Sequence, residues 1–306
     1  MPLQTSSPVL PSDTTGATDN LRGIILMALG FFVFAAADAA AKVLTQSLHP
    51  LEILWFRQSG LFTAIVIYIL MRGTAVLRTR SPKLQIARGV TATFSAVFFL
   101  IGITYVPLAD ATSVTFIAPF MVTVLAALIL RESVGIRRWT AVGVGLVGVL
   151  IVIRPGMGVF HPAIVFVLMA ATAFSLRQVL SRMLSGQENI MTTVAYTSIV
   201  SFVLACIGLP FVFTMPDTPQ QWLAIGIVAV LAATGEYLVI RALDIAQAVV
   251  VAPLHYTIIL WSTGYGFVLF GDLPDGWTLL GCAIIVASGL YTLNRERLAA
   301  RRKARD

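Results

Sequence analysis

Charged side chains are scarce in this sequence, and their scarcity argues against a soluble globular protein. Only 11% of the 306 residues are Asp, Glu, Lys or Arg, whereas 58% are hydrophobic. A soluble domain carries about 25% charged residues. Because so large an apolar surplus has to face lipid, we expect an integral membrane protein.

Cysteine and histidine are also rare. Cys206 and Cys282 both lie inside apolar runs, so they indicate neither a disulfide framework nor a metal cluster. The three histidines, His49, His161 and His255, fall in three separate regions. The chain has no H-E-x-x-H motif, Walker loop or G-x-S-x-G motif. We therefore expect no metal, no cofactor, no enzymatic activity and no nucleotide-driven pumping.

One stretch has the spacing of a dinucleotide-binding turn. Gly143, Gly145 and Gly148 follow the pattern G-x-G-x-x-G. No soluble βαβ unit surrounds them, and the polar residues about 20 positions later are Arg154 and His161 instead of the acidic residue that the fingerprint needs. In a membrane helix, small residues let two backbones approach closely. The pattern therefore favours helix packing over NAD binding.

What the sequence does have is long apolar runs. A helix needs about 20 apolar residues to cross a bilayer. Ten runs approach or exceed this length: 22–44, 51–71, 84–105, 108–130, 138–153, 162–184, 190–213, 220–242, 246–270 and 277–293. We predict an all-α integral membrane protein with ten transmembrane helices, of which the fifth is the shortest.

The basic residues indicate how these helices are oriented. In a ten-helix topology most of the 21 Lys and Arg residues, Arg88 among them, fall on the side of the two chain termini. Lys42 and Arg154 fall at the opposite surface, and Arg57 and Arg177 lie within helices. The positive-inside rule then places both termini in the cytoplasm. The net charge of +7 is thus a topology signal, and we expect a multi-pass protein of the bacterial inner (plasma) membrane that binds no nucleic acid.

Weak internal matches divide the chain in two. "FAAADAAAKVL" (34–44) resembles "FSLRQVLSRML" (174–184), and "WTAVG" (139–143) resembles "WTLLG" (277–281). The offsets of 137 to 140 are nearly half the chain, and five helices per copy give the copies opposite orientations. We predict a disordered cytoplasmic tail (1–21), two inverted five-helix repeats (22–157 and 158–293) and a basic cytoplasmic tail (294–306).

The segment "LADATSVTFIAPFMVTVLAALILRESVGIRRWTAVGVGLVGVLIVIRPG" resembles EamA-type members of the drug/metabolite transporter superfamily. The resemblance covers about residues 22 to 293. It rests on Glu132 after the fourth helix, then on Trp139 and a glycine-rich helix, with Asp272 in the acidic position of the second copy. It implies secondary transport of metabolites through a central cavity formed mainly by the third, fourth, eighth and ninth helices.

The chain is most similar to bacterial amino-acid exporters of this type. The resemblance implies that it exports amino acids of broad range, including aromatic ones, by alternating access, and we expect a monomer. One alternative is a carrier of another metabolite such as S-adenosylmethionine. Another, from a different class, is an intramembrane enzyme that uses Glu236 and His255.

Charged residues at membrane depth are costly and mark candidate functional sites. Asp38 and Arg57 lie at similar distances from the turn between the first two helices, so they should reach similar depth. We expect an ion pair, either a structural latch or a gating pair. Glu236 and His255, adjoined by Tyr237 and Tyr256, are similarly placed around a second turn.

Two roles are open for this second pair. The carboxylate of Glu236 could receive a substrate ammonium group or a proton, or the two side chains could form a structural hydrogen bond. Further candidates for lining the substrate site are Phe94, Phe98, Phe99, Thr115 and Trp261. Aromatic faces attract cations, although these rings could equally face lipid or other helices.

Pro119 and Pro253 lie in the fourth and ninth helices, which correspond in the two repeats. Each proline removes a helix hydrogen bond. Irregular backbone in corresponding helices of two repeats indicates a binding site or hinge, whereas a single proline can be a plain kink. We predict a hinge at each proline.

Overall fold

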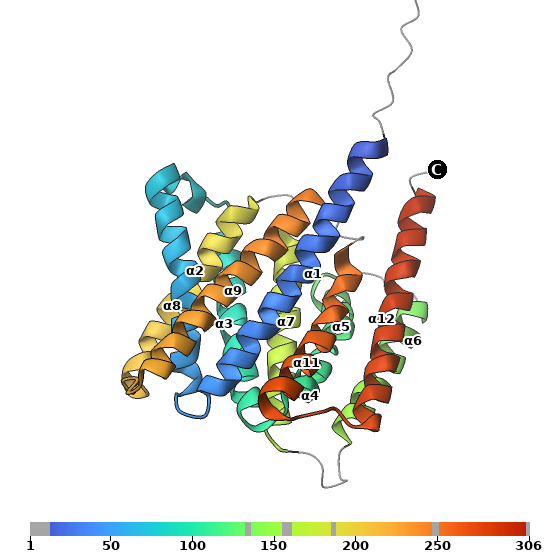
Figure 1. Ribbon diagram of the computed structural model, residues 1–306. Helices are drawn as coiled ribbons and strands as arrows, with labels where there is room; N and C mark the ends of the chain where they lie inside the picture. The colour runs from blue at the N-terminus through green and yellow to red at the C-terminus, as the bar shows by residue number, and fades with distance from the viewer. Residues whose placement is uncertain (1–12, 132–135, 155–160, 185–187, 247–250, 304–306) are drawn as a thin grey trace, which may run out of the picture.

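The computed structural model describes residues 13–131, 136–154, 161–184, 188–246 and 251–303 as a bundle of helices (Figure 1). The α-helices are α1 (Asp13–Leu44), α2 (Pro50–Arg72), α3 (Pro82–Tyr105), α4 (Leu108–Thr115), α5 (Ala118–Ile129), α6 (Ile136–Ile153), α7 (Ile164–Leu184), α8 (Ile190–Gly208), α9 (Pro219–Ile245), α11 (Ile258–Phe270) and α12 (Gly276–Lys303). Short 3₁₀ helices are η1 (Thr74–Leu77), η2 (Leu209–Phe211) and η3 (Ala252–Thr257). Within the described ranges there is no strand.

Seven of these helical stretches are long and apolar enough to cross a membrane. They correspond to seven of the ten predicted runs, with α4 and α5 together making one of them. The other three runs contain shorter apolar helices, Trp139–Ile153, Leu254–Phe270 and Gly276–Tyr291. The all-helical membrane architecture is therefore confirmed, and the count of ten spans stays a prediction.

Helix α1 begins, and helix α12 ends, at the same end of the bundle (Figure 1). We call this the terminal end and the opposite one, which holds the α1–α2 connection, the distal end. Residues 13–21, predicted within a disordered tail, belong to α1, because extending a nucleated helix costs little. Residues 1–12 of that predicted tail lie outside the described residues.

Packing between helices is most extensive for α1 with α9, α3 with α7, and α6 with α12. Each pair joins a helix from the first half of the sequence to one from the second. The two halves therefore interpenetrate instead of lying side by side, and they share one large apolar core built from both.

Glycines bring α6 and α12 into close contact. A Cβ atom added to Gly281 would lie 2.7 Å from the carbonyl oxygen of Gly148, and one added to Gly148 would lie 3.0 Å from that of Gly281. Gly145 lies against the ring of Phe120, while Gly143 faces open space. Gly145 and Gly148 therefore serve helix packing, as the sequence predicted.

Two spans are broken at their prolines. Helix α4 ends at Thr115, and α5 starts at Ala118 with Pro119 in its first turn. Pro253 lies in the first turn of η3, which continues into α11. The broken spans pack together, since the Thr112 hydroxyl donates a hydrogen bond to Ser262 Oγ at 3.1 Å. The irregular backbone is present at both prolines, and its role as a hinge stays a prediction.

Candidate functional site

Two arginines project between helices in the half of the bundle nearer the terminal end. Phe174, Arg177 and Ser181 share one face of α7, at helical spacing. The guanidinium carbon of Arg177 lies 4.7 Å from the centre of the Phe174 ring. From α3, Arg88 donates hydrogen bonds to Ser181 Oγ at 2.7 Å and to Thr197 Oγ1 of α8. Arg88 therefore reaches across to the face of α7 that carries Arg177.

Glu236 of α9 is the third charged group of this region. It interacts electrostatically with both Arg88 and Arg177. Within the described part of the chain its carboxylate forms no hydrogen bond or ion pair, and the buried Nε of Arg177 has no hydrogen-bond partner. We call Arg88, Arg177 and Glu236 the arginine site. It contains two cations and one anion.

Aromatic rings adjoin the arginine site through Phe174. The ring of His255 lies 6.4 Å from that of Phe174, 4.9 Å from Phe31 of α1 and 5.9 Å from Phe116 at the end of α4. Tyr256 lies 5.2 Å from Phe116. Charged and aromatic groups from several helices thus meet in one region, which suits a ligand with both a charged and an apolar part.

The expected Glu236–His255 contact is not among those of the described residues. His255 packs against phenylalanines, and the charged group that acts on it is Arg177. The prediction assumed a continuous α-helix on either side of one turn. His255 lies instead in a 3₁₀ helix, which rises about 2.0 Å per residue and changes both the depth and the direction of its side chain.

The other predicted lining residues do not converge on one place. Tyr237 is 61% exposed and Phe94 50% exposed on the surface of the bundle. Phe94 stacks on Phe98, the Phe98 ring lies tilted against that of Phe166 of α7, and Phe99 packs against the main core. The Thr115 hydroxyl donates to the carbonyl of Thr112, and Trp261 packs edge-on against Phe32 of α1 at 5.1 Å. Their role in substrate binding stays a prediction.

Asp38 and Arg57 form the expected ion pair. Nη1 of Arg57 donates to Oδ1 of Asp38 at 2.6 Å, which joins α1 to α2. The equal-depth argument holds here because both helices are regular between the turn and the charged residue.

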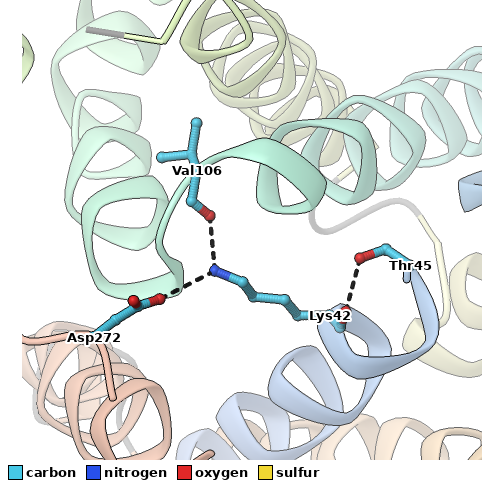
Figure 2. Close-up of polar contacts among 4 residues, drawn as sticks. All are labelled: Lys42, Thr45, Val106 and Asp272. Atoms are coloured by element: carbon cyan, nitrogen blue, oxygen red, sulfur yellow. Dashed lines mark hydrogen bonds and ion pairs between the residues drawn. The ribbon is translucent and has the colours of Figure 1, made fainter. Parts of the chain in front are cut away.

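Two further ion pairs lie at the distal end. Figure 2 shows the ammonium of Lys42, at the end of α1, between two acceptors: Asp272 at 3.5 Å and the carbonyl of Val106 at 3.0 Å. The same ammonium lies 4.9 Å from the centre of the Phe270 ring. Lys42 thus holds the α3–α4 and α11–α12 connections together.

Arg154 and Asp275 form the other contact, at 2.5 Å. The backbone N–H of Thr278 donates to Asp275 at 2.8 Å, and this bond together with Arg154 holds the pKa of Asp275 below its usual value. We call Lys42, Asp272, Arg154 and Asp275 the distal lock. Asp272 was expected to correspond to Glu132, which lies outside the described residues.

A groove of about 390 Å³ lies along one face of α9. It is lined by apolar residues and glycine: Trp222, Leu223, Gly226, Ile227, Val230 and Leu231. Three of these side chains, Leu223, Val230 and Trp222, are between 46% and 66% exposed. This face suits contact with lipid tails and does not include the arginine site.

Sequence reasoning did not single out Arg88 and Arg177 as candidate site residues. Arg88 was counted among the loop charges, and Arg177 was noted inside a helix without a role. The signal was present, because an arginine within an apolar span marks a candidate site on the same grounds as Asp38 and Arg57. The charged groups near Arg177 are Arg88 of α3 and Glu236 of α9. Spacing along the sequence alone does not bring these two helices together.

Comparison with known proteins decides the class. A sequence model of the EamA-like transporter family matches residues 21–154 and again 161–294. The chain belongs to this family. The two consecutive matches fall almost on the two predicted repeats.

Curated relatives of the transporter cover nearly its whole length. It is 27% identical to the S-adenosylmethionine uptake transporter of Rickettsia prowazekii (90% of this chain, 94% of that protein) and 29% identical to the pseudopaline exporter CntI of Pseudomonas aeruginosa strain UCBPP-PA14 (87% and 94%). It is 27% identical to a riboflavin transporter of Rhizobium johnstonii (92% and 94%). A crystal structure 18% identical to the chain superposes with a TM-score of 0.60, covering 92% of this chain and 99% of the other, and shows the fold alone. These relatives support transport as the class and leave the substrate open.

Proposed function

We propose that this chain is a secondary transporter of the bacterial plasma membrane whose substrate is an amino acid or a metabolite built on one. S-adenosylmethionine is the first candidate to test, ahead of the neutral amino acids whose export the sequence predicted. The observation that carries the proposal is the arginine site beside the rings of Phe174 and His255. The S-adenosylmethionine uptake transporters of Rickettsia support this ordering.

The chemistry of such a substrate complements the site. An α-amino acid carries a carboxylate and an ammonium group at neutral pH. Guanidinium groups bind carboxylates strongly, and Glu236 offers an anion to the ammonium. The rings of Phe174, Phe116 and His255 offer apolar faces to the remainder of the molecule, and such faces attract a sulfonium or ammonium cation.

The proposed mechanism is alternating access between the two ends of the bundle. We assign the terminal end to the cytoplasm from the distribution of basic residues. We propose that the distal lock, through its two ion pairs, keeps the opposite end closed in this state. Substrate at the arginine site crosses when the lock opens, and the direction of net transport follows the gradients on the two sides.

Counterflow in proteoliposomes tests this proposal. Vesicles are loaded with excess unlabelled S-adenosylmethionine, or with threonine, methionine or phenylalanine, and the labelled compound is added outside. We expect saturable accumulation of at least one of them. Glu236→Gln should lower it by about tenfold or more, because the ammonium loses its counter-charge.

The matched control is Asp217→Asn, which removes a carboxylate from the exposed α8–α9 connection and should leave accumulation unchanged. If folded wild-type protein accumulates none of the four compounds, the proposed substrate class is wrong.

A further inference from the structure

The charges of the arginine site do not balance. Asp38 and Arg57 neutralise each other in a direct ion pair. The charge of Glu236 acts on both Arg88 and Arg177, and within the described part of the chain no ion pair joins it to either. A charge inside a membrane protein is costly unless it is paired. The arginine site therefore has an excess of one positive charge that the described residues do not compensate.

The contacts of the two arginines solvate them without neutralising them. Arg88 is held in place by the hydroxyls of Ser181 and Thr197, which are uncharged acceptors. Arg177 lies over the ring of Phe174, and its buried Nε has no partner among the described residues. A guanidinium held in this way keeps donors available for a planar anion, and a carboxylate fits its fork of N–H groups.

We propose that Arg177, supported by Arg88, is the subsite for a carboxylate of the transported molecule, so that the protein selects an acid over its analogue without that group. This inference rests on the proposed function. The carboxylate supplies the missing negative charge, and the apolar part of the molecule lies beyond Phe174, where the rings of His255, Phe116 and Phe31 meet.

A purely structural role for Arg177 makes a different prediction. If the arginine served only to balance Glu236, its loss would weaken transport of every substrate by the same factor. If it binds the carboxylate, its loss weakens transport of the acid and spares the analogue. The two roles are therefore separated by the ratio of two substrates, which does not depend on how much protein is folded.

The experiment compares S-adenosylmethionine with its decarboxylated form in counterflow. The two share the adenosyl group, the sulfonium and the amine, and they differ in the carboxylate. In wild-type protein we expect the acid to be preferred by about tenfold or more, since a site built to bind a polar group rejects the analogue that lacks it. Arg177→Gln should reduce this preference to about unity, and Arg177→Lys should retain part of it, because an ammonium keeps the charge without the fork.

Arg182→Gln is the matched control. It removes an exposed arginine near the end of the same helix and should leave the preference unchanged. If wild-type protein accumulates both compounds equally, or if Arg177→Gln lowers both by one factor, the carboxylate subsite is wrong while the proposed function stands. If wild-type protein accumulates neither compound nor any of the amino acids tested, the proposed function itself is wrong. If Arg177→Gln does not fold, the preference for the acid is measured in wild-type protein and in Arg177→Lys. These two values then test the carboxylate subsite.

Discussion

At the scale of single residues, the ion pair of Asp38 and Arg57 fixes the first two spans to each other. Their side chains are only 13% and 17% exposed, so little water screens the interaction. Removing both partners of such a pair costs little, whereas removing one leaves an uncompensated charge inside the bundle. The pair therefore adds little net stability, but the loss of either partner alone is costly.

We predict that Asp38→Asn lowers the free energy of unfolding by about 3 kcal/mol, because Arg57 then lacks its counter-charge. Thermal unfolding in detergent measures the change. The control is the double variant Asp38→Asn with Arg57→Gln, which removes both charges and should recover most of the loss. Equal destabilisation of the single and double variants would show that the pair does not act as a unit.

The position of a side chain could be predicted from the sequence only where the backbone around it is a regular α-helix. Asp38 and Arg57 were placed correctly because an α-helix converts sequence distance into depth. The expected contact between Glu236 and His255 is not found among the described residues. His255 lies in η3, a 3₁₀ helix, and the pattern of apolar residues does not distinguish this helix type from an α-helix. The contact of Arg88 with Ser181 joins positions far apart in the sequence, which no spacing rule brings together.

At the scale of helices, α6 and α12 are held together by backbone contact at glycines. The carbonyl oxygen of Gly148 lies where a side chain on Gly281 would be, so neither position has room for a Cβ atom. We call this contact at Gly148 and Gly281 the glycine seam. It joins α6, from the first half of the chain, to α12, from the second half. We infer that these two helices move as one unit.

We predict that Gly281→Ala destabilises the protein by about 1–3 kcal/mol, because the new methyl group forces the two backbones apart. Gly143→Ala is the matched control: it faces open space on α6, and alanine favours a helix over glycine by about 1 kcal/mol. Thermal unfolding in detergent compares them. Similar shifts in unfolding temperature for both variants would mean that the glycine seam is not closely packed.

The breaks in two helices could be foreseen from Pro119 and Pro253, because proline lacks the N–H group that a helix interior needs. The way in which the helices pack on one another could not be foreseen from the sequence. Periodicity and internal matches divide the chain into two halves, which were predicted as two separate five-helix repeats. In the structure α1 packs on α9 and α3 packs on α7, so the two sequence halves do not form separate bodies.

At the scale of the whole molecule, the distal lock accounts for two exceptions to the charge rule. Lys42 and Arg154 are the basic residues that the sequence placed at the surface opposite the termini. The structure pairs them with Asp272 and Asp275, respectively. Each pair joins the first half of the chain to the second. We infer that these two cations hold the halves of the chain together at that surface.

In the proposed mechanism, substrate leaves the arginine site across the distal lock, and holding this lock closed tests that route. Lys42→Cys and Asp272→Cys are combined and joined with a short bifunctional thiol reagent, and counterflow is measured before and after. Wild-type protein treated with the same reagent controls for Cys206 and Cys282, and each single cysteine variant controls for modification alone. We predict that cross-linking abolishes counterflow, while the same variant transports before the reagent is added. Undiminished counterflow through fully cross-linked protein would contradict the account.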